Sequence, residues 1–387
     1  MILMQTKAIF IDAYRELNAK KLFWISLGLN LLAVAVFAAL GINDKGVSFL
    51  HWQFDMPMNT NFISKELFYK FQFTTWGVPF WLSWITAILA LISTAGIIPD
   101  MVSGGTIEPI LSKPITRVRF FLTKYLTGLL FVGLQILVFS IGCILVLGIR
   151  AGSWEFNLLL AVPIVLVFFS YLFGFCAFVG LITRSTIAAL LLTILFWSSI
   201  FVVNMGDTIM IAQREGKILE VEEYQEKIES QERFANKRIE QLEEQGKPVA
   251  GRDDQPLPDG AIDSLEAVNP TLKIARAQLV ASEEGVELWS NWANRVYRIK
   301  WLLPKTQETI GLLKRNLISD DELEMLASGN ENRRRNEDEP AMADPRVELR
   351  IEQALRGRTT LWVIGTSLIF EFFLVALSTL IFVRRDF

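Results

Sequence analysis

Six long apolar runs alternate with polar segments along this chain. They cover residues 22–40, 78–98, 125–149, 157–182, 187–203 and 361–383. About 20 residues of α-helix, at 1.5 Å per residue, cross the roughly 30 Å of hydrocarbon in a bilayer. A backbone in lipid must satisfy its own hydrogen bonds, and runs of this length do so as helices. The pattern therefore predicts an all-α, polytopic membrane protein with six transmembrane helices.

The residues before the first run predict an amphipathic N-terminal helix. Its apolar side comprises Ala8, Ile9, Phe10, Ala13, Tyr14 and Leu17. Its polar side comprises Asp12, Arg15, Glu16 and Lys20. Because the apolar positions recur at helical spacing, we expect an elbow helix along the inner membrane surface. The alternative is an ordinary polar lead-in to the first span.

The polar segment between the fifth and sixth runs predicts a large helical insertion. Eight of its positions recur at alternating spacings of three and four: Ile218, Val221, Gln225, Ile228, Glu232, Ala235, Ile239 and Leu242. This heptad seam, with two polar interruptions, indicates a coiled-coil helix over 212–245 that pairs with a second helix of the domain or with a sister subunit. A loop is expected at 246–270, with further helices at 271–300, 305–317, 320–327 and 346–358.

The predicted domains are residues 1–206, with five spans, residues 207–357, with the insertion, and residues 358–387, with the last span. The insertion holds 31 of the 41 acidic residues, so the formal net charge of −3 combines an acidic insertion with a basic remainder. If the N-terminus is cytoplasmic, the short inside segments carry eleven Lys and Arg residues and the short outside loops carry four. The positive-inside rule then places both termini in the cytoplasm and the insertion outside the cell (inner) membrane.

Composition excludes several classes of function. A chain that is 52% hydrophobic is too apolar for a soluble enzyme or a basic nucleic-acid-binding domain. A single His and two Cys, Cys143 and Cys176 in apolar runs, form neither a metal-ligand cluster nor a disulfide framework. No Gly-x-x-x-x-Gly-Lys-Ser/Thr stretch is present, so ATP and Mg²⁺ would have to be bound by a separate subunit. We therefore expect neither an enzyme nor a resident cofactor.

Two further features are candidates for function. Glu371 is the only charged residue within the six runs, and such a residue either serves a proton or cation path or is hydrogen-bonded by a neighbouring helix. Gln135 and Asn204 are candidate partners for it. The outside segment 41–77 is rich in aromatic residues, which favours a place along the outer interface, with an entry site for lipid or apolar cargo as the alternative.

The loop between the second and third spans predicts a short amphipathic helix. Pro99 should end or kink the second span, and the Gly104–Gly105 pair permits a reversal of the chain. Thr106 can cap the helix and Pro114 closes it. The basic residues that follow are suited to headgroup phosphates or an acidic partner. From physics alone, a plain loop with positive-inside residues remains the alternative.

The sequence of this loop resembles a known family. The stretch Gly-Thr-Ile-Glu-Pro-Ile-Leu-Ser-Lys-Pro-Ile-Thr-Arg, from Gly105 to Arg117, is similar to the corresponding signature of type-2 ABC transporter permeases. The N-terminal helix and the C-terminal Arg-Arg-Asp-Phe also resemble that family. A weaker likeness, at Trp301–Pro304, is to permeases grouped with multi-copper-enzyme maturation.

The resemblance implies that this loop is a coupling helix that contacts a cytoplasmic ABC ATPase subunit. The implied coupling residues are Gly105, Thr106, Glu108, Ile110, Leu111, Lys113, Pro114 and Arg117. Pro109 departs from the commonest form of the family and leaves the start of the helix, and so the face presented to the partner, open. The resemblance also implies a homodimer or pseudo-dimer of permeases.

The expected function is that of the permease subunit of an ATP-driven ABC exporter. The size of the insertion motivates a second version, in which the force acts on an extracytoplasmic protein partner instead of moving a solute. A membrane scaffold whose insertion recruits partners is the contrasting alternative, and a secondary transporter is a third. A P-loop protein that co-purifies in stoichiometric amount would separate the transporter from the scaffold.

Overall fold

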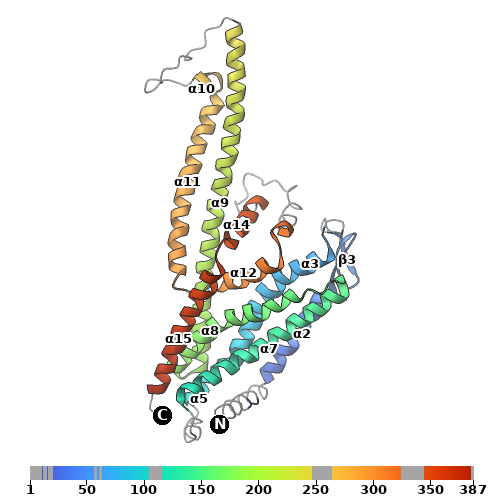
Figure 1. Ribbon diagram of the computed structural model, residues 1–387, viewed down its shortest axis with the longest axis vertical. Helices are drawn as coiled ribbons and strands as arrows, with labels where there is room; N and C mark the ends of the chain where they lie inside the picture. Colours follow the sequence, from blue (N-terminus) through green and yellow to red (C-terminus); the bar gives the residue numbers. More distant parts are fainter. Residues whose placement is uncertain are drawn as a thin grey trace. The chain divides into compact units, whose positions relative to one another are not determined.

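The structure, a computed structural model, describes residues 11, 15, 21–55, 59, 60, 63–103, 116–245, 264–323 and 344–384. The chain divides into two compact units (Figure 1). Unit 1 comprises Met1–Asn204, Ile299–Asn332 and Leu355–Phe387. Unit 2 comprises Met205–Arg298 and Arg333–Ala354. The predicted elbow helix, residues 1–20, lies almost wholly outside the described residues.

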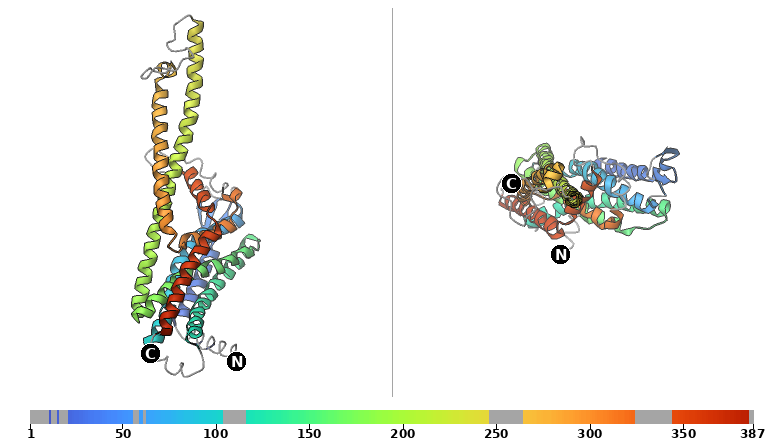
Figure 2. Two further views of the ribbon diagram at one scale, coloured as in Figure 1. Left: turned by 60° about the vertical axis from the view of Figure 1, so that its left-hand side comes forward. Right: turned by 90° about the horizontal axis from the view of Figure 1, so that it is seen from above.

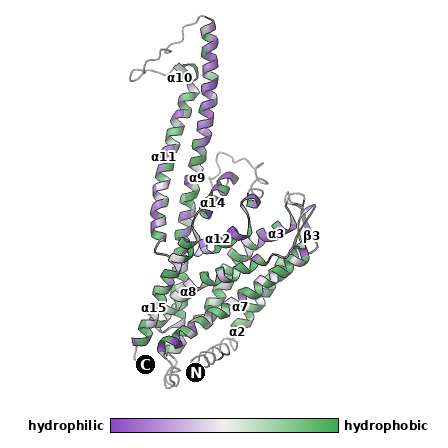
Figure 3. Cartoon of the chain, viewed as in Figure 1, coloured by the Kyte–Doolittle hydropathy of each residue, from purple (hydrophilic) through white to green (hydrophobic). Residues whose placement is uncertain are grey.

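Unit 1 is a bundle of apolar helices. Its elements are α2 (Lys21–Ala39), α3 (Lys65–Gln72), η1 (Phe73–Thr86), α4 (Ala87–Thr94), α5 (Ile97–Ser103), α7 (Arg117–Ala151), η2 (Phe156–Leu160), α8 (Ala161–Thr183), the first part of α9 (Thr186–Glu244), α12 (Thr306–Leu317), η4 (Leu361–Gly365) and α15 (Thr366–Arg384). Among the described residues, six helices or helix series are long and apolar enough to cross a membrane, which confirms the predicted spans. Figure 3 shows this apolar character along α2, α7, α8 and α15.

Aromatic rings and close helix contacts form the core of unit 1. Helix α8 packs against both α7 and α15, and α2 packs against α7. The rings of Phe175 on α8 and Phe196 on α9 stack with centroids 4.1 Å apart. At Gly128 of α7, a Cβ atom would lie 2.8 Å from the ring of Phe173, so a glycine is needed for this approach of α7 to α8.

The second span is longer than residues 78–98, because its helical series begins at α3. Ser64 caps α3 by accepting a hydrogen bond from the backbone N–H of Leu67 (3.1 Å). The series then continues through the π-helix η1, which contains Pro79, to a turn at Ala95 and Gly96. The break before α5 thus falls ahead of Pro99, which lies in the first turn of α5, where a missing N–H costs little.

The segment after α2 corrects the all-α prediction locally. Three antiparallel strands, β1 (Leu40–Asn43), β2 (Gly46–Phe49) and β3 (Trp52–Asp55), form a sheet in the order β1-β2-β3. The Asn43 side chain accepts hydrogen bonds from the backbone N–H groups of Lys45 and Gly46, which stabilises the first turn. The aromatic residues that predicted an interfacial segment are also good strand formers, and strands this short escape a search for long apolar runs.

Unit 2 is built around two long helices that lie side by side (Figures 1 and 2). They are α9, which enters unit 2 at Met205, and α11 (Pro270–Lys300), which follows the short α10 (Ser264–Val268). The predicted fifth span, 187–203, and the predicted insertion helix, 212–245, belong to one continuous helix, because α9 runs from Thr186 to Glu244. No proline interrupts it, and its two glycines, Gly206 and Gly216, are each tolerated in a helix at modest cost.

The facing sides of α9 and α11 are held by a seam and by polar contacts. Eight buried or half-buried α11 positions recur at spacings of three and four: Leu272, Ala275, Leu279, Ser282, Val286, Trp289, Ala293 and Val296. Of the predicted α9 seam, Ala235 and Ile239 are buried and Gln225 is exposed. Arg276 pairs with Glu232 (2.8 Å), so α11 is the second helix of the domain that the seam needs.

Helix α14 (Pro345–Arg356) completes unit 2, and ion pairs link it to α9. Arg346 contacts Glu223 (2.8 Å), and Arg350 contacts Glu222. The Arg350 hydrogen bond lowers the pKa of the Glu222 carboxyl. Helices α11, α12 and α14 agree with the helices predicted at 271–300, 305–317 and 346–358.

Candidate functional site

The coupling residues predicted from Gly105 to Pro114 lie outside the described residues, but the helices attached to them are described. Helix α5 ends at Ser103 and α7 begins at Arg117. Each of these helices contacts other helices at the same end of the bundle. The geometry of this end therefore shows which elements a movement of the loop would reach.

Helix α5 is tied to α8 and α9. The Thr186 hydroxyl at the start of α9 donates a hydrogen bond to Asp100 Oδ1 (3.0 Å). Pro99 packs directly on Gly180 of α8, where a Cβ atom would lie 2.8 Å from the proline ring. Because both contacts are close, a displacement of α5 would also displace α8 and α9.

Helix α7 is tied to the last span. Arg117 Nη1, on the only predicted coupling residue that is described, donates a hydrogen bond to the backbone carbonyl of Val383 on α15 (3.1 Å). Further basic residues gather at this end of the bundle: Lys21, Arg119, Lys124, Arg184 and Arg384. Such a collection suits an acidic protein face or lipid phosphates.

Glu371 has two hydroxyl donors inside the bundle. Its Oε1 accepts a hydrogen bond from the Tyr125 hydroxyl of α7 (2.8 Å), and its Oε2 accepts one from Ser170 Oγ of α8 (2.6 Å). Glu371 is thus hydrogen-bonded by neighbouring helices, as one of the two predicted alternatives has it, but the two named candidates are wrong. Gln135 accepts instead from Ser26 (2.8 Å), and Asn204 donates to Thr306 (3.3 Å).

Tyr125 was not among the predicted partners of Glu371, because the two named candidates were amides and Tyr125 lies in the third span whereas Glu371 lies in the sixth. The position of Tyr125 within an apolar run could have indicated the pairing, because polar side chains of membrane helices form hydrogen bonds with one another across helices. Glu371, Tyr125 and Ser170 join α15, α7 and α8 by one carboxylate. This arrangement links three helices, and Glu371 is the only Asp, Glu, Lys or Arg residue within the six predicted runs.

At the opposite end of the bundle, α12 is the helix on which several chain segments converge. It packs against α8, η1, η2 and η4. Glu308 of α12 pairs with Lys300 and with Arg358 (2.6 Å to the latter). The backbone N–H of Lys305 donates to Ser367 Oγ (2.9 Å). Together with the Asn204–Thr306 bond, these contacts tie α12 to α9, to the end of α11 and to the last span.

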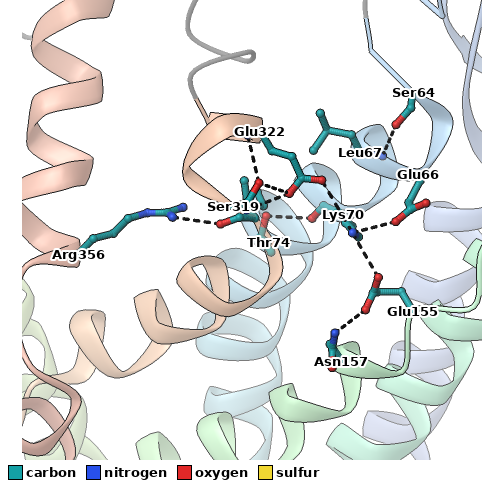
Figure 4. A network of polar contacts seen from close by, with 11 residues as sticks. Ser64, Glu66, Leu67, Lys70, Thr74, Glu155, Asn157, Ser319, Glu322 and Arg356 are labelled. Atoms are coloured by element: carbon teal, nitrogen blue, oxygen red, sulfur yellow. Dashed lines mark hydrogen bonds and ion pairs between the residues drawn. The ribbon is translucent and has the colours of Figure 1, made fainter.

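A second polar cluster secures the start of the second span (Figure 4). The Lys70 ammonium contacts Glu66 (2.8 Å), Glu155 (3.2 Å) and Glu322 (3.9 Å). These carboxylates come from α3, the segment before η2 and the segment after α12. Lys70 is nearly buried, and this pairing allows a charged side chain to lie within a long apolar helix series. The sequence analysis placed Lys70 in a loop and so missed the cluster.

A cavity of about 260 Å³ lies below α12. Its lining includes four aromatic residues, Trp84, Phe168, Trp197 and Phe201, and polar residues of α12 such as Gln307 and Lys314. Among the described residues, no group of three or more His, Cys, Asp or Glu side chains is arranged to hold a metal ion. The cavity thus offers apolar walls and a few polar groups, without a constellation for covalent chemistry.

Comparison with known proteins identifies the family. The family model described as ABC-2 family transporter protein matches residues 4–274, which include the predicted coupling loop. The segment Trp301–Pro304, which carried the weaker likeness, lies outside the match. Neither the curated proteins nor the solved structures contain a match to the chain. With six apolar helices and a family match over more than half its length, this chain belongs to the ABC-2 transporter family and is a multi-pass membrane component of an ABC transporter.

Proposed function

We propose that this chain is the permease subunit of an ATP-driven exporter. Family membership implies pairing with an ABC ATPase subunit in general. In our proposal that subunit is separate, binds ATP and Mg²⁺, and contacts the loop from Gly105 to Pro114. ATP-driven closure of the ATPase would press on the loop and change the arrangement of the helices. Such coupling needs a bistable bundle and no chemistry in this chain.

The observation that carries the proposal is the set of contacts made by the two helices that flank the loop. Helix α5 reaches α8 and α9 through Pro99 and Asp100, and α7 reaches α15 through Arg117. A push on residues 104–115 would therefore act on five helices, α5, α7, α8, α9 and α15, through direct contacts. Packed side chains transmit such displacements because a close-packed interior has little free volume.

The orientation and assembly of the protein are also part of the proposal. Both termini and the coupling loop lie in the cytoplasm, and residues 207–357 lie outside the cell (inner) membrane. Two permeases, as a homodimer or pseudo-dimer, rest on two ATPase subunits. The distribution of Lys and Arg among the short loops supports this orientation.

The test reverses one charge in the coupling loop. Glu108→Lys should remove stimulation of the partner ATPase in a reconstituted complex and leave membrane insertion intact. Glu287→Lys makes the same change at an exposed α11 position and serves as the matched control. Unchanged ATPase turnover in the Glu108 variant would refute the coupling role of the loop.

A mechanical version of this function is favoured by α9. That helix runs without a break from an apolar span into unit 2. In addition, α12 contacts Asn204, Lys300 and Arg358, and each of these residues lies within a few positions in sequence of a boundary between the units. Force in the bundle would then act on an extracytoplasmic protein. Deletion of residues 212–350 should abolish this action, whereas full solute transport by the shortened chain would count against the mechanical version.

A scaffold that never meets an ATPase remains the contrasting function. Purification of the full chain in mild detergent separates the two. A P-loop protein in stoichiometric amount supports the transporter, and its consistent absence supports the scaffold.

A further inference from the structure

A second cavity of about 260 Å³ lies between the first and second spans. Leu32, Ala33, Val36 and Phe37 of α2 form one wall, and Trp76, Gly77, Phe80 and Trp81 of η1 form the other. Phe139 of α7 closes its base, and Leu40 and Gln72 lie at one end. Apart from Gln72 and the indole N–H groups of Trp76 and Trp81, the latter donating to Asn30 (2.8 Å), the side chains of the lining are apolar.

The cavity opens onto a face of exposed apolar side chains. The exposed fractions of Leu32, Trp76 and Phe80 are 58%, 63% and 54%. In a membrane-spanning bundle such a face meets lipid chains. Ala33 and Gly77 keep the cavity hollow, because larger side chains at these two positions would point into it. At Gly77 the nearest atoms to an added Cβ are ring atoms of Phe139 and Phe73, 3.6 Å away.

Two polar groups lie at or next to one end of the cavity: a buried amide oxygen without a donor, and a guanidinium that contacts the lining residue Leu40. The buried Oε1 atom of Gln72 accepts no hydrogen bond from any described residue. Arg150, at the end of α7, donates only to the Tyr69 hydroxyl (3.2 Å) and to the backbone carbonyl of Leu40 (3.5 Å), a cavity residue. No carboxylate of the described chain lies within ion-pair distance of its guanidinium.

These groups specify the chemistry of an occupant. A buried acceptor that lacks a donor costs free energy, so an N–H or O–H group is needed at Gln72. A guanidinium without a carboxylate favours a phosphate, which matches its planar set of donors. An apolar cavity that opens to the hydrocarbon of the bilayer suits an acyl chain. A phospholipid whose headgroup bears a hydrogen-bond donor has all three parts.

We propose that the cavity between α2 and η1 binds one phospholipid of the surrounding bilayer. Its acyl chain lies between the walls from Leu32 to Leu40, its phosphate binds Arg150, and its headgroup donates to Gln72. The site requires only that unit 1 spans a membrane, so a test of lipid binding does not depend on the proposed ATP coupling. A second copy of this chain and a transported amphiphile are the competing occupants.

Native mass spectrometry of the full chain in detergent tests the site with three dioleoyl probes. Phosphatidylethanolamine has both a phosphate and a donor, phosphatidylcholine has the phosphate without the donor, and diacylglycerol lacks the phosphate. We expect one bound lipid per chain with affinity falling in that order. Each step should be about tenfold, as for the loss of a buried or charged hydrogen bond. Equal binding of all three probes would overturn the proposal.

Variants assign each part of the lipid to its residue. Gln72→Leu should make phosphatidylethanolamine and phosphatidylcholine bind equally, and Arg150→Gln should remove the advantage of phosphatidylcholine over diacylglycerol. Lys45→Gln, which removes an exposed cation from the β1–β2 turn, is the matched control and should change nothing. If Gln72→Leu and Arg150→Gln leave the order of affinities as in the wild type, the assigned contacts are wrong.

Filling the cavity separates the lipid from the competing occupants. Ala33→Leu and Gly77→Leu, on opposite walls, should each abolish the bound lipid, and one folded variant suffices for the test. A lipid-free dimer in the wild type that these variants convert to monomer would replace the lipid by a second copy. Retention of the lipid by a folded filled variant would contradict the site.

Discussion

The two units pair their helices by different means, although α9 belongs to both. In unit 1 the helices approach through glycines and stacked rings, and polar side chains such as Glu371 are satisfied by hydroxyls of other helices. In unit 2 the facing sides of α9 and α11 bury small and aliphatic side chains, with ion pairs such as Arg276–Glu232 at the edge. The backbone of α9 is continuous, so the side chains alone account for the change.

The difference follows from the solvent that each unit is proposed to meet. Lipid tails are as apolar as leucine, so burial of leucine gives little drive for association there, and close packing and hydrogen bonds must hold the helices. Water makes the burial of an apolar seam favourable and weakens ion pairs at its edge. Three substitutions test this contrast, and we give them from the largest expected effect to the smallest.

The largest effect is expected in the seam of unit 2. Leu272→Glu places a carboxylate at a fully buried position of α11 and should destabilise unit 2 by more than about 3 kcal/mol. Ile274→Glu, at a position that is 60% exposed on the same helix, is the control and should be almost neutral. Limited proteolysis should show new cleavage between residues 205 and 298 in the first variant only. Equal cleavage of both variants would contradict the assigned seam.

The second effect concerns a buried cation of α12's N-terminal end. Lys305 is 1% exposed, and its ammonium group donates to the Trp301 carbonyl and lies over the Trp362 ring. Burial lowers the pKa of Lys305 from 10.5 to about 8, against the opposing effect of Glu308. Between these two values the unfolded chain binds a proton that the folded chain has released, so stability should rise with pH across this window.

Lys305→Met should remove that rise and increase stability at pH 7, by up to about 3 kcal/mol. Thermal unfolding in detergent between pH 7 and 10 measures both changes. Lys237→Met, at an exposed position of α9, is the control and should leave the pH profile unaltered. A profile for Lys305→Met that rises like that of the wild type would show that another group titrates.

The smallest effect compares two glycines of unit 1. Gly180→Ala forces a methyl group against Pro99 and should destabilise the bundle by about 1–3 kcal/mol. Gly311→Ala meets no atom within 4 Å and should stabilise α12 by up to about 1 kcal/mol through helix propensity. Melting temperatures that move in the same direction would disprove the close approach of α5 to α8.

Much of the helical architecture followed from periodicity, and the failures have specific causes. The six spans and helices α11, α12 and α14 were predictable, because each is a long segment with a strong pattern. The sheet β1-β2-β3 was missed because four-residue strands have no such pattern. The extension of the second span to Lys65 was not predicted because Lys70 is a charged residue. Its charge is paired with Glu66, Glu155 and Glu322 only in the folded chain.

The candidate sites divide in the same way. The loop from Gly105 to Arg117 was found in the sequence because its residues are contiguous. Glu371 was also found, as the one charge within the spans, but its partners Tyr125 and Ser170 lie more than 200 residues away. The cavity between α2 and η1 could not be predicted from the sequence, because Arg150 is far from Gln72 and Gly77 in the chain and only helix packing brings it to the lining residue Leu40.

By itself the sequence determined that this protein is a six-span membrane chain with a charged helical insertion and a permease-like loop, because hydrophobic periodicity and local motifs need no knowledge of distant residues. Only the tertiary structure decided which groups face one another: Glu371 with two hydroxyls, Lys70 with three carboxylates, Arg150 with no carboxylate. The physical reason is that a polar side chain acquires its role from the partner it meets, and helix packing brings together partners that are remote along the chain.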